Sequence, residues 1–164
     1  MEESQVKISF PDPHVAYKIM PAKRDKMALD VTTIDSDDQE KGAMILWDYH
    51  GGPNQQFFLK RVCDNKFYII NIGTGFALDV PENTNRDVQL CMNPLTESKS
   101  QVWEFVECGR NLYKIQSFCG KVLDVSGYFL WNGGKVLQFE DHNGQNQKWK
   151  ISPGWFALLL MSKN

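Results

Sequence analysis

A threefold internal repeat constrains the fold of this 164-residue chain more than any other feature of its sequence. Gln-x-aromatic triplets occur at residues 55–57, 101–103 and 147–149, so successive triplets are 46 residues apart. A Leu-Asp-Val triplet precedes each of them, at residues 29–31, 78–80 and 123–125. Self-similarity at such a period indicates a repeat architecture, in which no single copy buries its apolar face alone.

Each copy has the pattern of short strands joined by turns. Apolar runs of four to six residues, rich in Val, Ile, Phe, Tyr and Trp, are separated by Gly, Asn, Asp and Pro. No stretch in the body of the chain sustains helical periodicity over three turns. Three copies of this kind predict an all-β, closed threefold fold, the β-trefoil, with about twelve short strands.

We expect residues 1–164 to form a single domain, because 42% hydrophobic and 23% charged residues are typical of one soluble domain. The repeats span approximately residues 14–62, 63–108 and 109–153, and an apolar tail follows at 154–164. The tail residues 155–161 are too apolar to extend into water and too short to span a membrane. They either pack back on the domain or form a homodimer interface.

Composition and motifs exclude several classes of function. Lys and Arg total 18 against 20 Asp and Glu, a formal charge of -2, so no broad cationic surface is available for nucleic acid. No apolar run approaches the roughly 20 residues of a membrane span, and the N-terminal residues lack the pattern of a secretory signal. We therefore expect a cytoplasmic or leaderless secreted protein.

The chain also lacks the motifs of catalytic and metal sites. It has no Ser/His/Asp or Cys/His arrangement in a catalytic context and no glycine-rich phosphate loop, so we expect neither an enzyme nor a cofactor. The four cysteines show no CxxC pairing with matching histidines, and we expect free thiols and no metal site. An incidental disulfide remains an alternative.

Period-2 alternation gives each residue of the Leu-Asp-Val strand a separate place. Leu and Val share the face that enters the core, whereas Asp points toward a surface pocket. The aromatic residues of the Gln-x-aromatic triplets are expected to fill the centre of a small barrel. The neighbouring Gln should be buried with its amide paired, because an unpaired buried amide costs about 1–3 kcal/mol.

The three ordered copies of these two motifs, over about residues 14–153, resemble the ricin B-chain-type β-trefoil lectins, the QxW family, which includes trefoil carbohydrate-binding modules of some glycosidases. In such lectins a copy forms a shallow sugar site from three side chains. These are the Asp of the Leu-Asp-Val strand, an aromatic ring after the third strand, and the Asn that precedes Gln-x-Trp. A ring stacks on the C–H face of a sugar, while carboxylate and amide bind its hydroxyls.

The resemblance implies complete sites in repeats 1 and 3. A His lies five residues before the motif Gln in both, where it either contacts the sugar or remains a solvated loop side chain. The candidate carbohydrate-binding residues are Asp30, Trp47, His50, Asn54 and Gln55 in repeat 1, and Asp124, Phe139, His142, Asn146 and Gln147 in repeat 3. Repeat 2 has no ring at residues 89–93 and has Ser100 in place of Asn, so we expect no site there although Asp79 remains.

The resemblance therefore implies a non-catalytic, multivalent lectin for galactose- or N-acetylgalactosamine-type glycans of glycoproteins or glycolipids. The alternative is a protein-interaction trefoil, such as a protease inhibitor or cytoskeletal binder, with vestigial sugar residues. Loss of the set in repeat 2 alone favours the lectin, because a purely structural motif should decay evenly. For Trp131, in a loop of repeat 3, a surface contact and a loop anchor remain equal alternatives.

Overall fold

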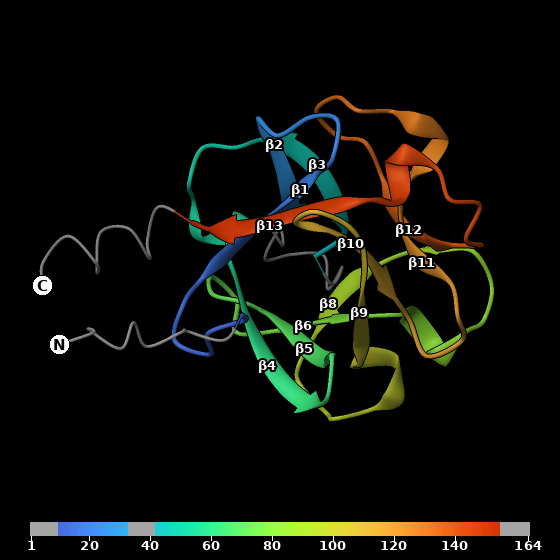
Figure 1. Ribbon diagram of the computed structural model, residues 1–164. Coiled ribbons are helices and arrows are strands. Elements are labelled where there is room, and N and C mark those ends of the chain that lie inside the picture. The colour runs from blue at the N-terminus through green and yellow to red at the C-terminus, as the bar shows by residue number, and fades with distance from the viewer. Residues whose placement is uncertain (1–9, 33–41, 155–164) are drawn as a thin grey trace, which may run out of the picture.

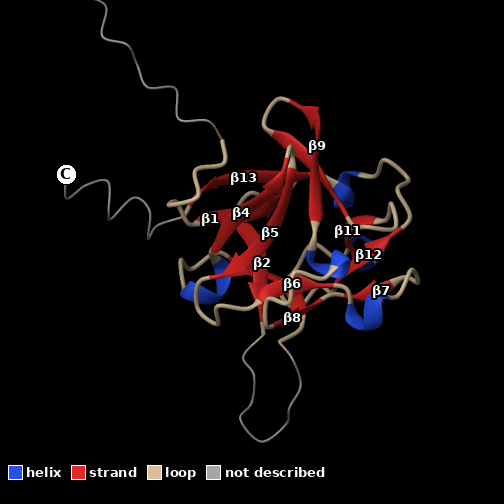
Figure 2. Cartoon of the chain, turned by 90° about the horizontal axis from the view of Figure 1, so that it is seen from below, coloured by secondary structure: helices blue, strands red, loops and turns tan. Residues whose placement is uncertain are grey.

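The computed structural model describes residues 10–32 and 42–154. These residues form an all-β fold of thirteen strands with five short 3₁₀ turns (Figures 1 and 2). The strands are β1 (Tyr17–Pro21), β2 (Met27–Val31), β3 (Met44–Asp48), β4 (Phe57–Cys63), β5 (Lys66–Asn71), β6 (Ala77–Asp79), β7 (Val88–Gln89), β8 (Cys91–Asn93), β9 (Trp103–Gly109), β10 (Leu112–Gln116), β11 (Val122–Val125), β12 (Val136–Phe139) and β13 (Trp149–Pro153). The 3₁₀ turns are η1 (Pro53–Gln55), η2 (Pro81–Asn83), η3 (Lys99–Gln101), η4 (Ser126–Tyr128) and η5 (Gln145–Gln147).

Six strands close into a barrel. Antiparallel pairing runs from β1 to β4, β5, β9, β10 and β13 and returns to β1. Three further hairpins, β2 with β3, β6 with β8 and β11 with β12, add one hairpin for each repeat. This arrangement is the predicted β-trefoil. The described strands number thirteen rather than about twelve because repeat 2 adds β7, which pairs with β12 of repeat 3.

The Gln-x-aromatic triplet is the point at which a turn becomes a barrel strand. In all three repeats a 3₁₀ turn ends at the motif Gln, and the strand begins at the motif aromatic residue. Phe57, Trp103 and Trp149 are fully buried in the core, as predicted. The two indoles also donate Nε1–H hydrogen bonds of 3.0 Å, from Trp103 to the Leu78 carbonyl and from Trp149 to the Leu123 carbonyl. Each bond ties a barrel strand to the hairpin of its own repeat.

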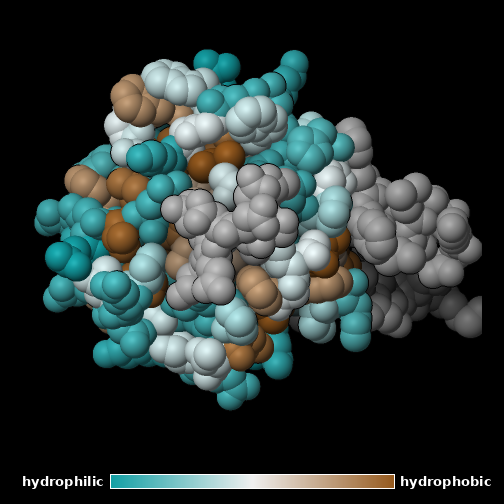
Figure 3. All heavy atoms as spheres, turned by 180° about the vertical axis from the view of Figure 1, so that it is seen from behind, coloured by the Kyte–Doolittle hydropathy of each residue, from teal (hydrophilic) through white to brown (hydrophobic). Residues whose placement is uncertain are grey.

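The surface is mainly hydrophilic, and apolar residues form separate patches on the face seen in Figure 3. In the described part of the chain, no helix has the length and apolar character needed to cross a membrane. No disulfide joins any of the four cysteines, all of which lie within the described ranges; Cys91 is buried and Cys63 is exposed. The predicted packing or dimerisation of the tail concerns residues 155–161, which lie outside the described residues.

Candidate functional site

A buried carboxylate stands at the centre of each candidate site. Asp30 and Asp124 lie on the hairpin strands β2 and β11, where they are only 5% and 3% exposed. The motif Gln holds each carboxylate from behind, with a bond of 2.9 Å from Gln55 Nε2 to Asp30 Oδ2 and of 2.8 Å from Gln147 Nε2 to Asp124 Oδ2. The carboxylates therefore lie at the bottom of their sites and not on the rim.

The two glutamines position other groups and do not line the surface. Both are fully buried, as the sequence predicted. Besides the carboxylate, the Nε2 of Gln55 donates to the Asp48 carbonyl, and its Oε1 accepts from the His50 backbone N–H, each at 2.9 Å. Gln147 makes the same three contacts in repeat 3. One amide thus fixes both the carboxylate and the loop that carries the histidine.

The predicted histidines fold over the carboxylates. Nε2 of His50 lies 3.9 Å from Asp30 Oδ2, and Nε2 of His142 lies 3.5 Å from Asp124 Oδ2. The Gly52 N–H donates to His50 Nδ1 at 3.1 Å, so Nε2 carries the ring proton and faces the carboxylate. These N···O separations are too long for a strong direct hydrogen bond. A ligand hydroxyl placed between the two groups can accept from Nε2–H and donate to the carboxylate.

The two asparagines differ in their hydrogen bonds. Asn54 Nδ2 donates to Asp30 Oδ1 at 3.1 Å. Both asparagines donate from Nδ2 to the carbonyl of the preceding motif Val, Asn54 to Val31 at 3.4 Å and Asn146 to Val125 at 3.0 Å. Asn146 Oδ1 is buried with no partner among the described residues. An unsatisfied buried oxygen is costly, and a hydroxyl of a bound ligand would satisfy it.

Aromatic rings form the walls. Trp47 is 42% exposed and pairs in register with Ala28, and Phe139 takes the equivalent place opposite Val122. In repeat 3 a cavity of about 260 Å³ lies between the rings of Phe139 and Tyr128, over Asp124. Tyr128, on η4, was not predicted from the sequence. The Ser-Gly-Tyr turn directly after a Leu-Asp-Val strand is the signal that indicates it.

Burial governs the electrostatics of both carboxylates. Desolvation raises the pKa of Asp30 and of Asp124, and hydrogen bonds from Gln55 and Gln147 oppose part of this rise. A carboxylate with little water around it gains more from ligand hydroxyls than an exposed one does.

Repeat 2 keeps the carboxylate and the motif Gln101, whose Nε2 donates to Asp79 Oδ2 at 3.2 Å, but it lacks the ring, the histidine and the asparagine. Asn93 takes the register position of Trp47 and Phe139, opposite Ala77, and its Nδ2 donates to Asp79 Oδ2 at 2.9 Å. Thr96 takes the place of the histidines, because its N–H donates to Oε1 of the motif Gln. The amide of Asn93 therefore bonds Oδ2 of Asp79, whereas Oδ2 of Asp30 and of Asp124 faces a histidine Nε2.

A model of the ricin-type β-trefoil lectin domain matches residues 16–151, which is most of the chain. The chain belongs to this family. Membership indicates carbohydrate binding, and lectin domains of this kind also occur attached to enzymes. No curated protein sequence is significantly similar to the chain.

Solved structures share the fold of this ricin-type lectin domain. The designed threefold symmetric protein ThreeFoil aligns with a TM-score of 0.77 and 28% identity, over 83% of this chain and 96% of its own. An exo-β-1,3-galactanase from Clostridium thermocellum aligns with a TM-score of 0.77 and 31% identity, over 87% of this chain but only 31% of its own. A ricin B-like lectin from Macrolepiota procera, solved with lactose, has a TM-score of 0.65 and 24% identity, over 84% of this chain and 94% of its own.

The ten residues predicted for this ricin-type lectin domain fall into two separate groups of five, one built on Asp30, with Trp47 on the same β2–β3 hairpin, and one built on Asp124. Within the described ranges, no group of three His, Cys, Asp or Glu side chains is arranged to hold a metal ion. Gln138, which lies in the ring-bearing strand of repeat 3, is fully buried and donates to the carbonyls of Thr84 and Arg86. It connects repeats 2 and 3 and does not face the cavity.

Proposed function

We propose that this ricin-type lectin domain binds galactose-type glycans without modifying them, through one site around Asp30 and a second around Asp124. The observation that carries the proposal is the repeated set itself. A desolvated carboxylate, a histidine Nε2 within 4 Å of it and an aromatic ring, exposed in Trp47 and half-buried in Phe139, occur together in repeats 1 and 3, and repeat 2 lacks the ring and the histidine.

Galactose suits this arrangement chemically. Its axial 4-hydroxyl leaves one face of the ring as a continuous C–H surface, which can stack on Trp47 or Phe139. Hydroxyls at the edge of the sugar donate to Asp30 or Asp124 and accept from the histidine Nε2–H. In repeat 3, the unpaired Oδ1 of Asn146 provides one further acceptor.

The carboxylate geometry supports binding without hydrolysis. Glycosidases place two carboxyl groups about 5–10 Å apart, on either side of the bond they cleave. The cavity of repeat 3 has Asp124 as its only acidic lining residue, and the counterpart Asp30 belongs to another repeat. The galactanase relative aligns over only 31% of its length, in keeping with a binding domain attached to a separate catalytic part.

Two sites on different repeats favour multivalent binding. A shallow site of about 260 Å³ should bind a single sugar weakly, at about millimolar to micromolar affinity. Simultaneous engagement of clustered glycans on a glycoprotein or glycolipid would then strengthen the overall binding.

The test is a calorimetric titration of the chain with galactose, N-acetylgalactosamine and, as a negative sugar, glucose. We expect two sites for the galactose-type sugars, one site after Asp30→Asn or Asp124→Asn, and none after both. Asp79→Asn is the matched control in repeat 2 and should retain two sites. A folded chain that binds no galactose-type sugar, or a double variant that binds like the wild type, would refute the proposal.

A further inference from the structure

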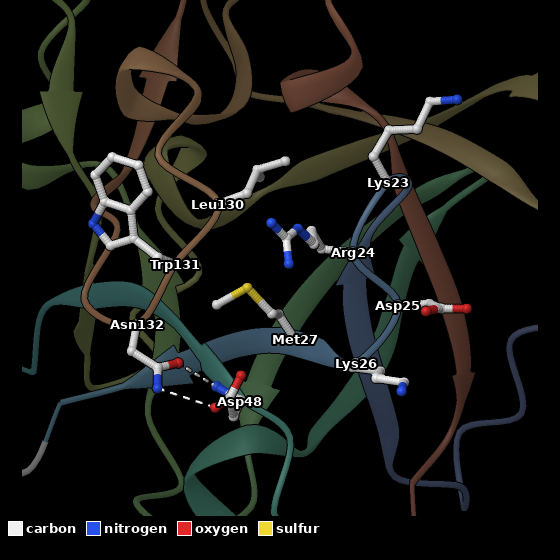
Figure 4. Close-up of a pocket in the computed structure, with 9 residues that line it drawn as sticks. All are labelled: Lys23, Arg24, Asp25, Lys26, Met27, Asp48, Leu130, Trp131 and Asn132. Atoms are coloured by element: carbon white, nitrogen blue, oxygen red, sulfur yellow. Dashed lines mark hydrogen bonds between the residues drawn. The ribbon is translucent and has the colours of Figure 1, made fainter.

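A second kind of cavity lies at the junction of repeats 1 and 3, outside both proposed sugar sites (Figure 4). Its volume is about 460 Å³, within the range of small-molecule sites. The turn between β1 and β2 forms one side, and the loop between η4 and β12 forms the other. The lining residues are Lys23, Arg24, Asp25, Lys26, Met27, Asp48, Leu130, Trp131 and Asn132.

Trp131 is a fixed and exposed platform. The residues that follow Trp131 are hydrogen-bonded to β3. Asn132 makes two bonds with Asp48, of 2.8 and 3.1 Å. Gly133 and Gly134 bond to the backbone of Leu46. The ring packs on Phe129, with centroids 4.4 Å apart, yet the residue remains 57% exposed. The loop is therefore anchored through Asn132, and Trp131 itself is held at the surface. An ordered, exposed indole is a ready surface for stacking.

Arg24 supplies an uncommitted cation beside this platform. Figure 4 shows its guanidinium directed into the cavity, between Met27 and Leu130 and toward the Trp131 loop. Among residues 10–32 and 42–154, no hydrogen bond or ion pair engages the Arg24 side chain. Lys23 and Lys26 also line the cavity, and Figure 4 shows their ammonium groups directed away from the Trp131 loop, which leaves Arg24 as the cation that faces the indole side.

The two acidic residues of the cavity do not cancel this charge. Asp25 points away from the Trp131 loop in Figure 4. The Asp48 carboxylate accepts a hydrogen bond from Asn132 Nδ2 at the opposite edge. A guanidinium with no internal partner recognises carboxylate and sulfate groups through two parallel hydrogen bonds.

We propose that this cavity binds a sugar residue that carries an anionic group, a carboxylate or a sulfate, with Arg24 pairing the anion and Trp131 stacking on the sugar ring. The inference shares only its ligand class with the proposed function, and it concerns different residues. The protein would then bind acidic glycans through the junction and neutral galactose-type sugars through Asp30 and Asp124.

The experiment is a ¹⁵N NMR titration of the full chain, followed at the tryptophan indole N–H signals. The probes are glucuronic acid and galactose 6-sulfate, with galactose as the neutral sugar and inorganic sulfate as the bare anion. We expect saturable shifts of Trp131 with either or both acidic sugars, which identifies the anionic group. Galactose should shift Trp47 instead, so failure of the proposed function would be visible separately.

Three substitutions sharpen the test. Arg24→Ala should weaken acidic-sugar binding about tenfold, as expected for loss of one charge-assisted pair. Asp25→Asn removes a negative charge from the cavity lining and should not weaken it, and both variants should leave the galactose response of Trp47 unchanged. Arg110→Ala removes the same charge from an exposed residue outside the cavity and is the matched control.

Any one of five results would overturn the inference. The Trp131 signal could fail to shift with any acidic sugar, or it could shift equally with galactose. Inorganic sulfate could bind as tightly as galactose 6-sulfate, or the Arg24→Ala variant could bind acidic sugars with wild-type affinity. A Trp131 signal that changes only with protein concentration would assign the surface to self-association and would also overturn it.

Discussion

The glycine three residues before the motif Gln should decide whether a repeat can bind sugar. Gly52 and Gly144 hold this place in repeats 1 and 3, and Ser98 holds it in repeat 2. All three have the same extended backbone, with φ of -66°, -71° and -63° and ψ of 159°, 156° and 150°. The backbone therefore accepts a side chain at this position, and any effect of adding one must come from its neighbours.

Those neighbours are the site residues themselves. A Cβ at Gly144 would lie 2.4 Å from His142 Cε1 and 2.5 Å from Asn146 Oδ1, whereas real Cβ contacts are longer than 3.0 Å. We expect the half-exposed His142 ring to swing away from Asp124 at little cost. Displacing the buried Asn146 would also lengthen its bond to the Val125 carbonyl, at a cost of about 1 kcal/mol.

Gly144→Ala should thus leave the chain folded, with a free energy of unfolding lower by about 1–2 kcal/mol, and should weaken galactoside binding in repeat 3. Two ligand hydrogen bonds worth about 1 kcal/mol each correspond to roughly a tenfold to hundredfold loss of affinity. Calorimetric titration should show one normal site and one weakened site, and chemical denaturation should report the stability.

Ser98→Gly is the reverse substitution and the control, and it should leave sugar binding unchanged because Asn93 still covers Asp79. Wild-type affinity at both sites in Gly144→Ala would refute the reasoning, since it would mean that the positions of His142 and Asn146 are irrelevant to binding.

Three further predictions test the carboxylates, the core and repeat 2. Because burial raises the pKa of Asp30 and Asp124, galactoside binding should weaken on acidification before an ordinary exposed carboxyl would titrate, as calorimetry over a pH series can show. The folded state therefore binds the protons of these two carboxyl groups more tightly than the unfolded state does, and their contribution to stability falls as the pH rises through the raised pKa. Asp124→Asn should accordingly have a melting temperature no lower than that of the wild type at neutral pH. Trp103→Phe removes the donor to the buried Leu78 carbonyl and should lower the free energy of unfolding by about 1–3 kcal/mol in urea denaturation; an unchanged midpoint would contradict this. Converting repeat 2 to the pattern of its neighbours should raise the number of galactoside sites from two to three, with the substitutions N93W, T96H, S98G and S100N; a count that stays at two would show that further residues are needed.

The sequence alone determined the fold and the inner half of each site. The 46-residue period predicted that Phe57, Trp103 and Trp149 lie in the core, because the ring recurs in every copy. The alternation within each Leu-Asp-Val strand predicted that its Leu and Val lie there too. The same local rules predicted that Gln55 and Gln147 would be buried and paired. Their contacts lie within one repeat, where sequence spacing translates directly into register.

Only the tertiary structure decided what lies around those inner parts. The register of β8 brings Asn93 to Asp79, and the left-handed turn at Tyr128 forms the second wall of the repeat 3 cavity. Arg24 and Trp131 come from different repeats, and they share a cavity only because the closed barrel brings repeat 1 beside repeat 3. No local period encodes such a contact, since barrel closure places these loops together.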